Sequence, residues 1–281
     1  MNAAQDALAL GLPAAGTSHP LAAWRLAAEP FYQPTGDEVA RFEAASAQRL
    51  PLLIKGPTGC GKTRFVEHMA WRLGRPLVTV ACHEDLSAGD LVGRWLLDGH
   101  GTRWQDGPLT LAARHGAICY LDELVEARAD ATVVIHPLTD TRRMLPLAQR
   151  DEVVHAHPDF QLVVSYNPSP MAREIKASTR QRFCALEFGH PAPEREAGIV
   201  ARESGLDIAR CAAIVAFGVR TRRLQGQGLD EGASTRMLVH AALLVQQGQS
   251  PAAACAMAVA DALSDEPGVQ QALHAALDAS F

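Results

Sequence analysis

The sequence predicts an α/β fold with a parallel five-stranded sheet, followed by a small all-α domain. Five short apolar runs lack polar alternation, as expected of strands that are buried on both faces. Helical or polar stretches separate the runs, and strands that alternate with helices indicate a parallel sheet. After residue 190 the chain is rich in Ala, Leu and Glu and is broken by Gly and Pro, which predicts a helical bundle. The apolar runs are 50–54, 76–81, 117–121, 160–165 and 183–188.

The composition is typical of a packed globular protein, with 48% hydrophobic and 20% charged residues among 281. The net charge of −5 gives no strong field that favours nucleic acid or anionic lipid. Six scattered cysteines without a C-x-x-C pair predict reduced thiols in a cytoplasmic chain rather than a disulfide framework or a zinc site. No uninterrupted apolar run approaches the roughly 18 residues of a membrane span.

These patterns divide the chain into three parts. We expect an N-terminal tail or strap over residues 1–30, a nucleotide-binding α/β core over 31–190 and a helical C-terminal domain over 191–281. The last boundary is placed near residue 190, because the character of the sequence changes after the segment His190-Pro191-Ala192-Pro193.

A candidate phosphate loop follows the first apolar run. The segment fits G-x-x-x-x-G-K-[ST] at every position, with Gly56, Pro57, Thr58, Gly59, Cys60, Gly61, Lys62 and Thr63. Glycines let backbone N–H groups wrap a phosphate, Lys62 supplies charge to the β- and γ-phosphates, and the Thr63 hydroxyl can bind Mg²⁺. A Gly-rich turn without a ligand is the plainer alternative. The predicted strand before the loop and helix after it favour a site for ATP or ADP with Mg²⁺.

Two further strands end in polar residues that suit phosphate chemistry. The run 117–121 ends in Asp122 and Glu123, at the edge where ligands lie in open α/β sheets. Asp122 would hold Mg²⁺ through water, and Glu123 would polarise the water that attacks the γ-phosphate. Asn167 follows the run 160–165 and could hydrogen-bond both the γ-phosphate and that water. Solvated acids at a strand exit and a turn-forming Asn-Pro are the alternatives.

Together these features resemble an AAA+ ATPase of the MoxR branch, and within it the CbbQ/NorQ/NirQ group. The resemblance covers about residues 30–245. The residues that carry it are Lys55–Arg64 (KGPTGCGKTR), Val78–Asp85 (VTVACHED), Asp90–Gly93, Trp104–Ala112 (WQDGPLTLA), Gly116–Asp122 (GAICYLD), His136–Asp140 (HPLTD), His157–Phe160 (HPDF), Ser165–Pro168 (SYNP), Ser178–Phe183 (STRQRF) and Leu229–Leu238 (LDEGASTRML).

The resemblance implies a ring, usually a hexamer, that binds nucleotide between neighbouring subunits. Arg182 matches the arginine that acts on the γ-phosphate of the next subunit, and Arg180 is near enough to share or exchange that role. Arg236 matches the arginine of the helical domain that contacts nucleotide within its own subunit. Arg64 ends the matching phosphate-loop segment and is placed with the nucleotide-binding residues. A planar, permanently charged guanidinium suits the charge of phosphoryl transfer, although a solvated surface pair is the alternative for Arg180 and Arg182.

The branch also implies two insertions in the core. The first, in the helix after the second strand, matches about residues 89–105, and the hairpin before the Asn-bearing strand matches about 143–157. Val92, Gly93, Arg94 and Trp95 would face a pore or a partner; the alternative is that Trp95 and Trp104 pack the small core of the insertion itself. The loop between Asn167 and Ser178 departs from relatives, which tend to carry a slightly longer, Gly- and Tyr-bearing loop. The conformation of this loop affects the direction in which the side chains of Arg180 and Arg182 point.

The function that the resemblance implies is a ring motor that remodels a client enzyme. The favoured client is Rubisco. The motor, acting together with a von Willebrand A partner of the CbbO type, would release inhibitory sugar phosphates from it. The alternative is a NorQ/NirQ-type chaperone for nitric oxide reductase, with a NorD-type partner. A nucleic-acid remodelling ATPase is the alternative from another class, and the acidic charge and scarcity of lysine oppose it.

Overall fold

The computed structural model describes residues 21–99, 101–168 and 175–281, and it divides into two compact units. The first unit contains the chain up to Lys55 and Lys62–Glu187. The second contains Gly56–Gly61 and Phe188–Phe281. Most of the predicted N-terminal tail, residues 1–20, and positions 169–174 of the loop after Asn167 lie outside the described residues.

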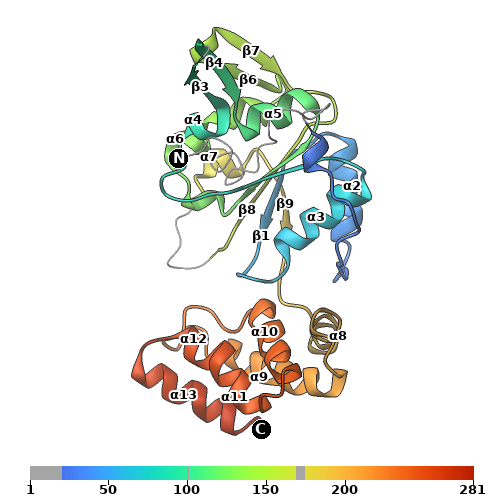
Figure 1. Cartoon of the computed structure of the whole chain (residues 1–281), viewed down its shortest axis with the longest axis vertical. Coiled ribbons are helices and arrows are strands. Elements are labelled where there is room, and N and C mark those ends of the chain that lie inside the picture. Colours follow the sequence, from blue (N-terminus) through green and yellow to red (C-terminus); the bar gives the residue numbers. More distant parts are fainter. Residues whose placement is uncertain (1–20, 100, 169–174) are drawn as a thin grey trace. The chain divides into compact units, whose positions relative to one another are not determined.

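The first unit is built on a parallel five-stranded sheet with the order β2-β5-β8-β1-β9, which confirms the predicted fold class. Figure 1 labels three of its strands, β1, β8 and β9. Its strands are β1 (Leu52–Lys55), β2 (Leu77–Ala81), β5 (Ile118–Asp122), β8 (Gln161–Tyr166) and β9 (Cys184–Glu187). The central strands lack polar alternation because both of their faces are covered: every residue from Ile118 to Leu121 is buried.

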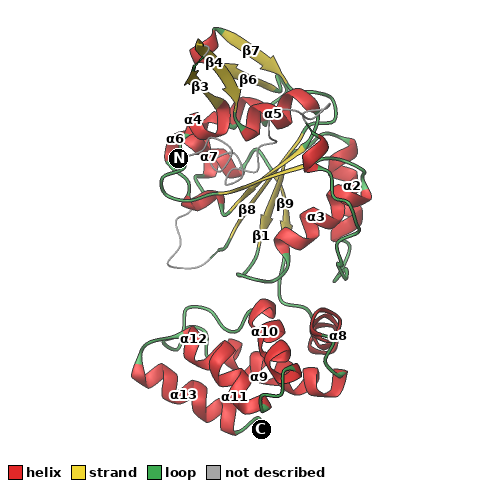
Figure 2. Ribbon diagram, viewed as in Figure 1, coloured by secondary structure: helices red, strands yellow, loops and turns green. Residues whose placement is uncertain are grey.

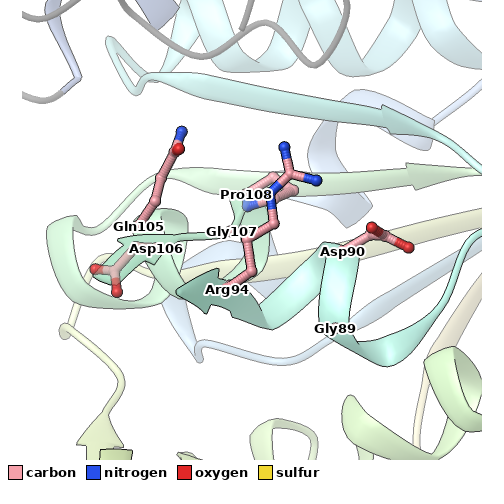
Figure 3. A pocket seen from close by; sticks show the side chains of 8 residues that line it. Gly89, Asp90, Arg94, Gln105, Asp106, Gly107 and Pro108 are labelled. Atoms are coloured by element: carbon pink, nitrogen blue, oxygen red, sulfur yellow. The ribbon is translucent and has the colours of Figure 1, made fainter. Parts of the chain in front are cut away.

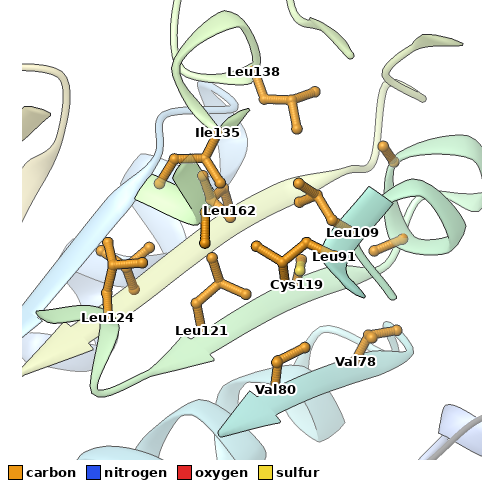
Figure 4. Close-up of a cluster of buried hydrophobic side chains, with 14 of the residues drawn as sticks. Val78, Val80, Leu91, Leu109, Cys119, Leu121, Leu124, Ile135, Leu138 and Leu162 are labelled. Atoms are coloured by element: carbon orange, nitrogen blue, oxygen red, sulfur yellow. The ribbon is translucent and has the colours of Figure 1, made fainter. Parts of the chain in front are cut away.

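Helices and short helical turns surround this sheet (Figure 2). They are η1 (Ala22–Trp24), α2 (Glu38–Ala47), α3 (Lys62–Arg72), α4 (Ala88–Val92), α5 (Pro108–His115), η2 (Leu124–Glu126), α6 (Ala129–Val134), η3 (His136–Leu138), η4 (Ala148–Arg150) and α7 (Ala177–Arg180). One apolar cluster lies between β2, β5, β8 and the segments α4 to η3, with Val78, Leu91, Leu121 and Ile135 among its members (Figure 4). This core holds the carboxyl ends of β5 and β8 in place, where the candidate acids lie.

Two antiparallel hairpins extend the first unit: β3 (Gly93–Asp98) with β4 (Gly101–Asp106), and β6 (Met144–Leu147) with β7 (Glu152–His155). Contacts lie both within the β3–β4 hairpin and between the two hairpins, directly or through Arg114 of α5. Trp95 packs edge-on against Trp104, and its indole N–H donates to the carbonyl of Gln149 at 3.2 Å. Arg114 forms ion pairs with Asp106 at 2.8 Å and with Glu152 at 2.6 Å. The hairpins therefore support one another.

A small pocket lies at the base of the β3–β4 hairpin, where α4 ends and α5 begins (Figure 3). Asp90, Arg94 and Asp106 are its charged lining residues. Asp90 also closes a capping box with Ser87 at the start of α4, so part of this lining stabilises a helix end.

The second unit is helical from α8 onward. Its elements are α8 (Pro193–Ser204), α9 (Ile208–Arg223), α10 (Thr235–Gln246), α11 (Pro251–Cys255), the π-helical turn η5 (Ala256–Ala260), α12 (Asp261–Leu263) and α13 (Pro267–Asp278). Its own core includes Ile214, Phe217, Leu238 and Leu273. Among the residues that the structure describes, none of the helices is both long and apolar enough to cross a membrane.

Candidate functional site

The phosphate loop has the backbone that its glycines predict. Gly59 and Gly61 adopt φ values of +67° and +101°, a region that favours glycine. A Cβ on Gly59 would lie 2.6 Å from the Cβ of Ser234, and a Cβ on Gly56 would lie 2.5 Å from the carbonyl oxygen of Phe188. Both positions therefore require glycine for space as well. Within the loop Cys60 is buried and Thr58 is exposed.

Lys62 and Thr63 begin helix α3 and reach the acids at the end of β5. The Lys62 side chain is only 5% exposed, and its Nζ lies 3.8 Å from Oε1 of Glu123. The Thr63 hydroxyl donates to Oδ2 of Asp122 at 3.0 Å. The structure thus brings these four predicted residues together within the first unit.

Glu123 has an unusual backbone and a perturbed carboxyl group. Its φ of +56° and ψ of +50° lie in the left-handed region, which is uncommon for a residue with a side chain. Burial raises the pKa of the Glu123 carboxyl above its ordinary value. The charge of Lys62 and a hydrogen bond from the backbone of Asn167 oppose this shift, whereas Asp122 adds to it. Asn167 thus contacts Glu123 through its backbone.

Sequence reasoning missed two hydroxyl groups at this site. The hydroxyls of Tyr120 and Ser165 donate to Oδ1 of Asp122 at 2.7 and 2.5 Å, and both residues are fully buried. The backbone N–H of Glu123 donates to Oγ of Ser165 at 3.1 Å. Period-two spacing offered a signal, because Tyr120 lies two positions before Asp122 on one strand and Ser165 lies two before Asn167.

Oxygen ligands for a magnesium ion converge at this point. The hydroxyl of Thr63 and the carboxylate of Asp122 lie within hydrogen-bond distance, with Oδ2 of Asp122 on the side of Thr63. Hard oxygen donors of this kind suit Mg²⁺, which usually retains several waters and takes one or two carboxylates plus phosphates. The residues present therefore fit the ion.

The predicted trans-acting arginines lie at the end of α7 and just after it, in the first unit. Arg180 ends α7 and is exposed; Arg182 follows it, with Nη1 4.0 Å from Oδ2 of Asp140. His136 contacts the α7 residue Thr179, with 2.9 Å between Nε2 and Oγ1. Burial, and secondly the charge of Arg182, lower the pKa of His136. No described contact links Arg180 or Arg182 to Lys62, Asp122 or Glu123 of this chain.

Two other predicted nucleotide-binding arginines have exposed side chains. Arg64 forms an ion pair with Glu67 on α3 at 3.3 Å. Arg236 lies in the first turn of α10, beside the loop: a Cβ on Gly59 would be 3.8 Å from that of Arg236. Ser234 caps the same helix by accepting the N–H of Met237.

A buried ion pair holds this end of α10. Both Nη atoms of Arg222 bind the carboxylate of Glu196 at 2.7 Å, and Thr235 donates to the same carboxylate at 2.6 Å. Nε of Arg222 donates to the carbonyl of Ala233 at 2.8 Å. The network joins α8, α9 and the start of α10, so it fixes the backbone around Ser234.

A phosphate loop on a five-stranded parallel sheet, an acidic pair on the next-but-one strand and a trailing helical unit define an ATPase of the AAA+ class. A family model, the AAA domain of the dynein-related subfamily, matches residues 51–183 and agrees with this assignment. The chain is therefore an AAA+ ATPase and binds nucleotide.

Within that class the chain belongs to the CbbQ/NirQ/NorQ family. The model of the CbbQ/NirQ/NorQ C-terminal region matches residues 196–280. Protein CbbQ of Hydrogenophilus thermoluteolus is 60% identical over 255 residues, which cover 90% of this chain and 96% of that protein. Protein NorQ of Paracoccus denitrificans is 58% identical over 247 residues, which cover 87% and 92%.

A likeness in structure extends beyond recognisable sequence similarity. A crystal structure of a protein from Cytophaga hutchinsonii covers 85% of this chain and 80% of its own, with a TM-score of 0.51 and 15% identity. At that identity the likeness concerns the fold alone.

Proposed function

We propose that this chain is the ATP-hydrolysing subunit of a ring motor that remodels a client enzyme, and that the client is Rubisco. The observation that carries the hydrolytic part is the cluster of Lys62, Thr63, Asp122 and Glu123, which combines phosphate binding with a carboxylate able to activate water. The identification of the client depends on the family relationship.

Each residue of the cluster has a distinct task in this proposal. The loop amides and Lys62 bind the phosphates, Thr63 and Asp122 hold Mg²⁺, and Glu123 accepts a proton from the attacking water. The bound ion neutralises the charge on the phosphates. The raised pKa of Glu123 suits this task, because a base works best when its pKa lies nearer the working pH. Asn167 orients Glu123 or the water.

Arginines supply further positive charge around each nucleotide of the ring. Arg182, with Arg180 beside it, acts on the nucleotide of the neighbouring subunit, and Arg236 acts on the nucleotide of its own subunit. The described contacts of Arg182 include Asp140 but neither Asp122 nor Glu123 of its own chain, which is consistent with a role across an interface. A hexamer that works in the cytoplasm with a von Willebrand A adaptor of the CbbO type completes the proposal.

Two variants test the hydrolytic assignment. Lys62→Ala should lose ATP binding, because it removes the one buried positive charge described beside Glu123. Glu123→Gln keeps the size of the side chain and should bind ATP but hardly hydrolyse it. Phosphate release and the binding of a fluorescent ATP analogue measure the two effects. Full turnover by either variant contradicts the assignment.

The client is tested with purified proteins. Rubisco blocked by a tight-binding sugar phosphate is incubated with the chain, the adaptor and ATP, and recovery of carboxylase activity is measured. Recovery that requires ATP and is absent with Glu123→Gln supports the proposal. No recovery, under conditions where the chain hydrolyses ATP, contradicts Rubisco as the client and leaves the ATPase assignment intact.

Nitric oxide reductase is the second candidate client, and the 58% identity to protein NorQ favours it almost as strongly as CbbQ favours Rubisco. Co-expression of the reductase with a NorD-type adaptor, with and without this chain, tests it through nitric oxide consumption. A gain that needs Glu123 would assign this client.

A further inference from the structure

We propose that Ser165 is a positioning residue of the ATPase site, and that its hydroxyl sets the direction of both acids, Asp122 and Glu123. The inference deepens the proposed function and rests on the roles given there to these two residues. The register of the sheet brings Ser165 and Asp122 together. Strands β5 and β8 are parallel neighbours, with Leu121 opposite Val164, so the next residues, Asp122 at the end of β5 and Ser165 one residue before the end of β8, lie side by side.

The Ser165 hydroxyl makes one hydrogen bond to each acid. Its proton goes to Oδ1 of Asp122 at 2.5 Å, and its oxygen accepts the backbone N–H of Glu123 at 3.1 Å. A hydroxyl has one donor and two acceptor positions, so one group can satisfy both links at once. Ser165 is fully buried, so water does not compete for these bonds.

The hydrogen bond between the amide of Glu123 and the Ser165 hydroxyl acts on an unfavourable backbone conformation. A left-handed conformation at a residue with a side chain costs free energy, and it persists where the surroundings fix it. The Ser165 hydroxyl supplies such a contact at the amide of Glu123 itself. Because the backbone angles of Glu123 determine where its side chain begins, this contact controls the direction of its carboxylate.

The link to Asp122 fixes the rotation of the other carboxylate. Ser165 and Tyr120 both donate to Oδ1, which leaves Oδ2 for the hydroxyl of Thr63. Burial, and secondly the nearby Asp122, raise the pKa of the Tyr120 phenol well above its ordinary value, so this donor keeps its proton. Ser165 differs from Tyr120 in a decisive respect, because only its hydroxyl also binds the amide of Glu123.

The test compares two serine-to-alanine variants. Ser165→Ala removes both links, whereas Ser46→Ala makes the same change at a buried serine of α2 that binds Arg75. Ser165→Ala should lower kcat about ten- to hundredfold, as expected when a reacting group is misdirected. The Kd for a fluorescent ATP analogue should change less than about threefold, because Lys62 and the loop remain. Tyr120→Phe keeps the link to Glu123 and should lose less of kcat than Ser165→Ala.

Several results would overturn the proposal. A kcat for Ser165→Ala equal to that of Ser46→Ala shows that the hydroxyl does not position the acids. A loss of ATP affinity as large as the loss of kcat shows a general structural role. If Ser165→Ala does not fold, Ser165→Cys carries the same test, because its thiol fills similar space but is a weak donor and acceptor.

Glu123→Gln, measured in the same series, separates this inference from the function on which it rests. Wild-type turnover by Glu123→Gln contradicts the role of Glu123 and the inference with it. An inactive Glu123→Gln beside a fully active Ser165→Ala contradicts the positioning role alone.

Discussion

The ion pair between Arg222 and Glu196 allows a sharp prediction about the helical unit. Glu196 is completely buried, and Arg222 is 14% exposed. Replacing Arg222 by Met keeps most of the apolar stem but removes every donor that the guanidinium supplies. The carboxylate of Glu196 then retains only the hydroxyl of Thr235. A buried charge left without its partner costs about 3–5 kcal/mol, which is a large part of the stability of a small domain.

The assay is equilibrium unfolding in urea and by heat, followed by the circular dichroism of the helices. In a unit of this size such a loss should lower the midpoint of the helical transition by more than about 12 °C. Arg223→Met is the matched control, because Arg223 is exposed on the same last turn of α9 and its loss should cost less than about 0.5 kcal/mol. The start of α10 should also loosen, so ATP affinity should fall with stability.

A double variant tests the reason for the loss. Arg222→Met combined with Glu196→Met removes the unpaired charge and leaves the hydroxyl of Thr235 and the carbonyl of Ala233 without these partners. Those two losses cost roughly 2 kcal/mol together, so the double variant should be more stable than the single one. The reasoning is refuted if Arg222→Met unfolds within 1 kcal/mol of the wild type, or if the double variant is no more stable.

Three other predictions follow from the site. Glu123 must be ionised to accept a proton from water. We therefore expect kcat to reach its maximum above the raised pKa of Glu123 and to fall as the pH drops through that pKa. The fall should begin at a higher pH than the titration of an exposed glutamate allows, and a rate that falls only where an exposed glutamate titrates contradicts this. Arg182→Ala should abolish turnover but leave ATP affinity nearly unchanged; if Arg180→Ala does so instead, the two roles are exchanged. Gly59→Ala should weaken ATP binding, because a Cβ would meet Ser234, and unchanged affinity would show that the loop adapts.

The sheet could be predicted from the sequence because burial on both faces removes polar alternation. Leu52, Leu53 and Ile54 are all buried, and they form the apolar run that precedes the phosphate loop. The bounds were less accurate: the run 183–188 predicted a longer strand than β9, which ends at Glu187. Strand ends depend on hydrogen bonds to neighbours, which a local apolar pattern does not contain.

The supporting contacts of the site could not be predicted in the same way. The spacing of two positions indicates that Tyr120 and Asp122 share a face of β5, but it does not specify a hydrogen bond between the Tyr120 hydroxyl and Asp122. The contact between Ser165 and Asp122 depends on which strands are neighbours and in which register. The pair of Glu196 and Arg222 joins two helices across 26 positions, beyond the three- and four-residue spacings that sequence alone can interpret.

The use of lysine and arginine follows the geometry that each cation must satisfy. Of 26 basic residues only three are lysines, at positions 55, 62 and 176, and this count by itself indicates no function. The buried position in the cluster is held by Lys62, whose compact ammonium can turn its three donors between Glu123 and a phosphate. The carboxylate of Glu196 accepts two parallel hydrogen bonds in one plane. The planar guanidinium of Arg222 provides both donors, whereas the ammonium of a lysine does not. Arg182 and Arg236 are exposed and permanently charged, so they retain their charge in the absence of a nucleotide. The chemistry of each cation therefore agrees with the role proposed for it at that position.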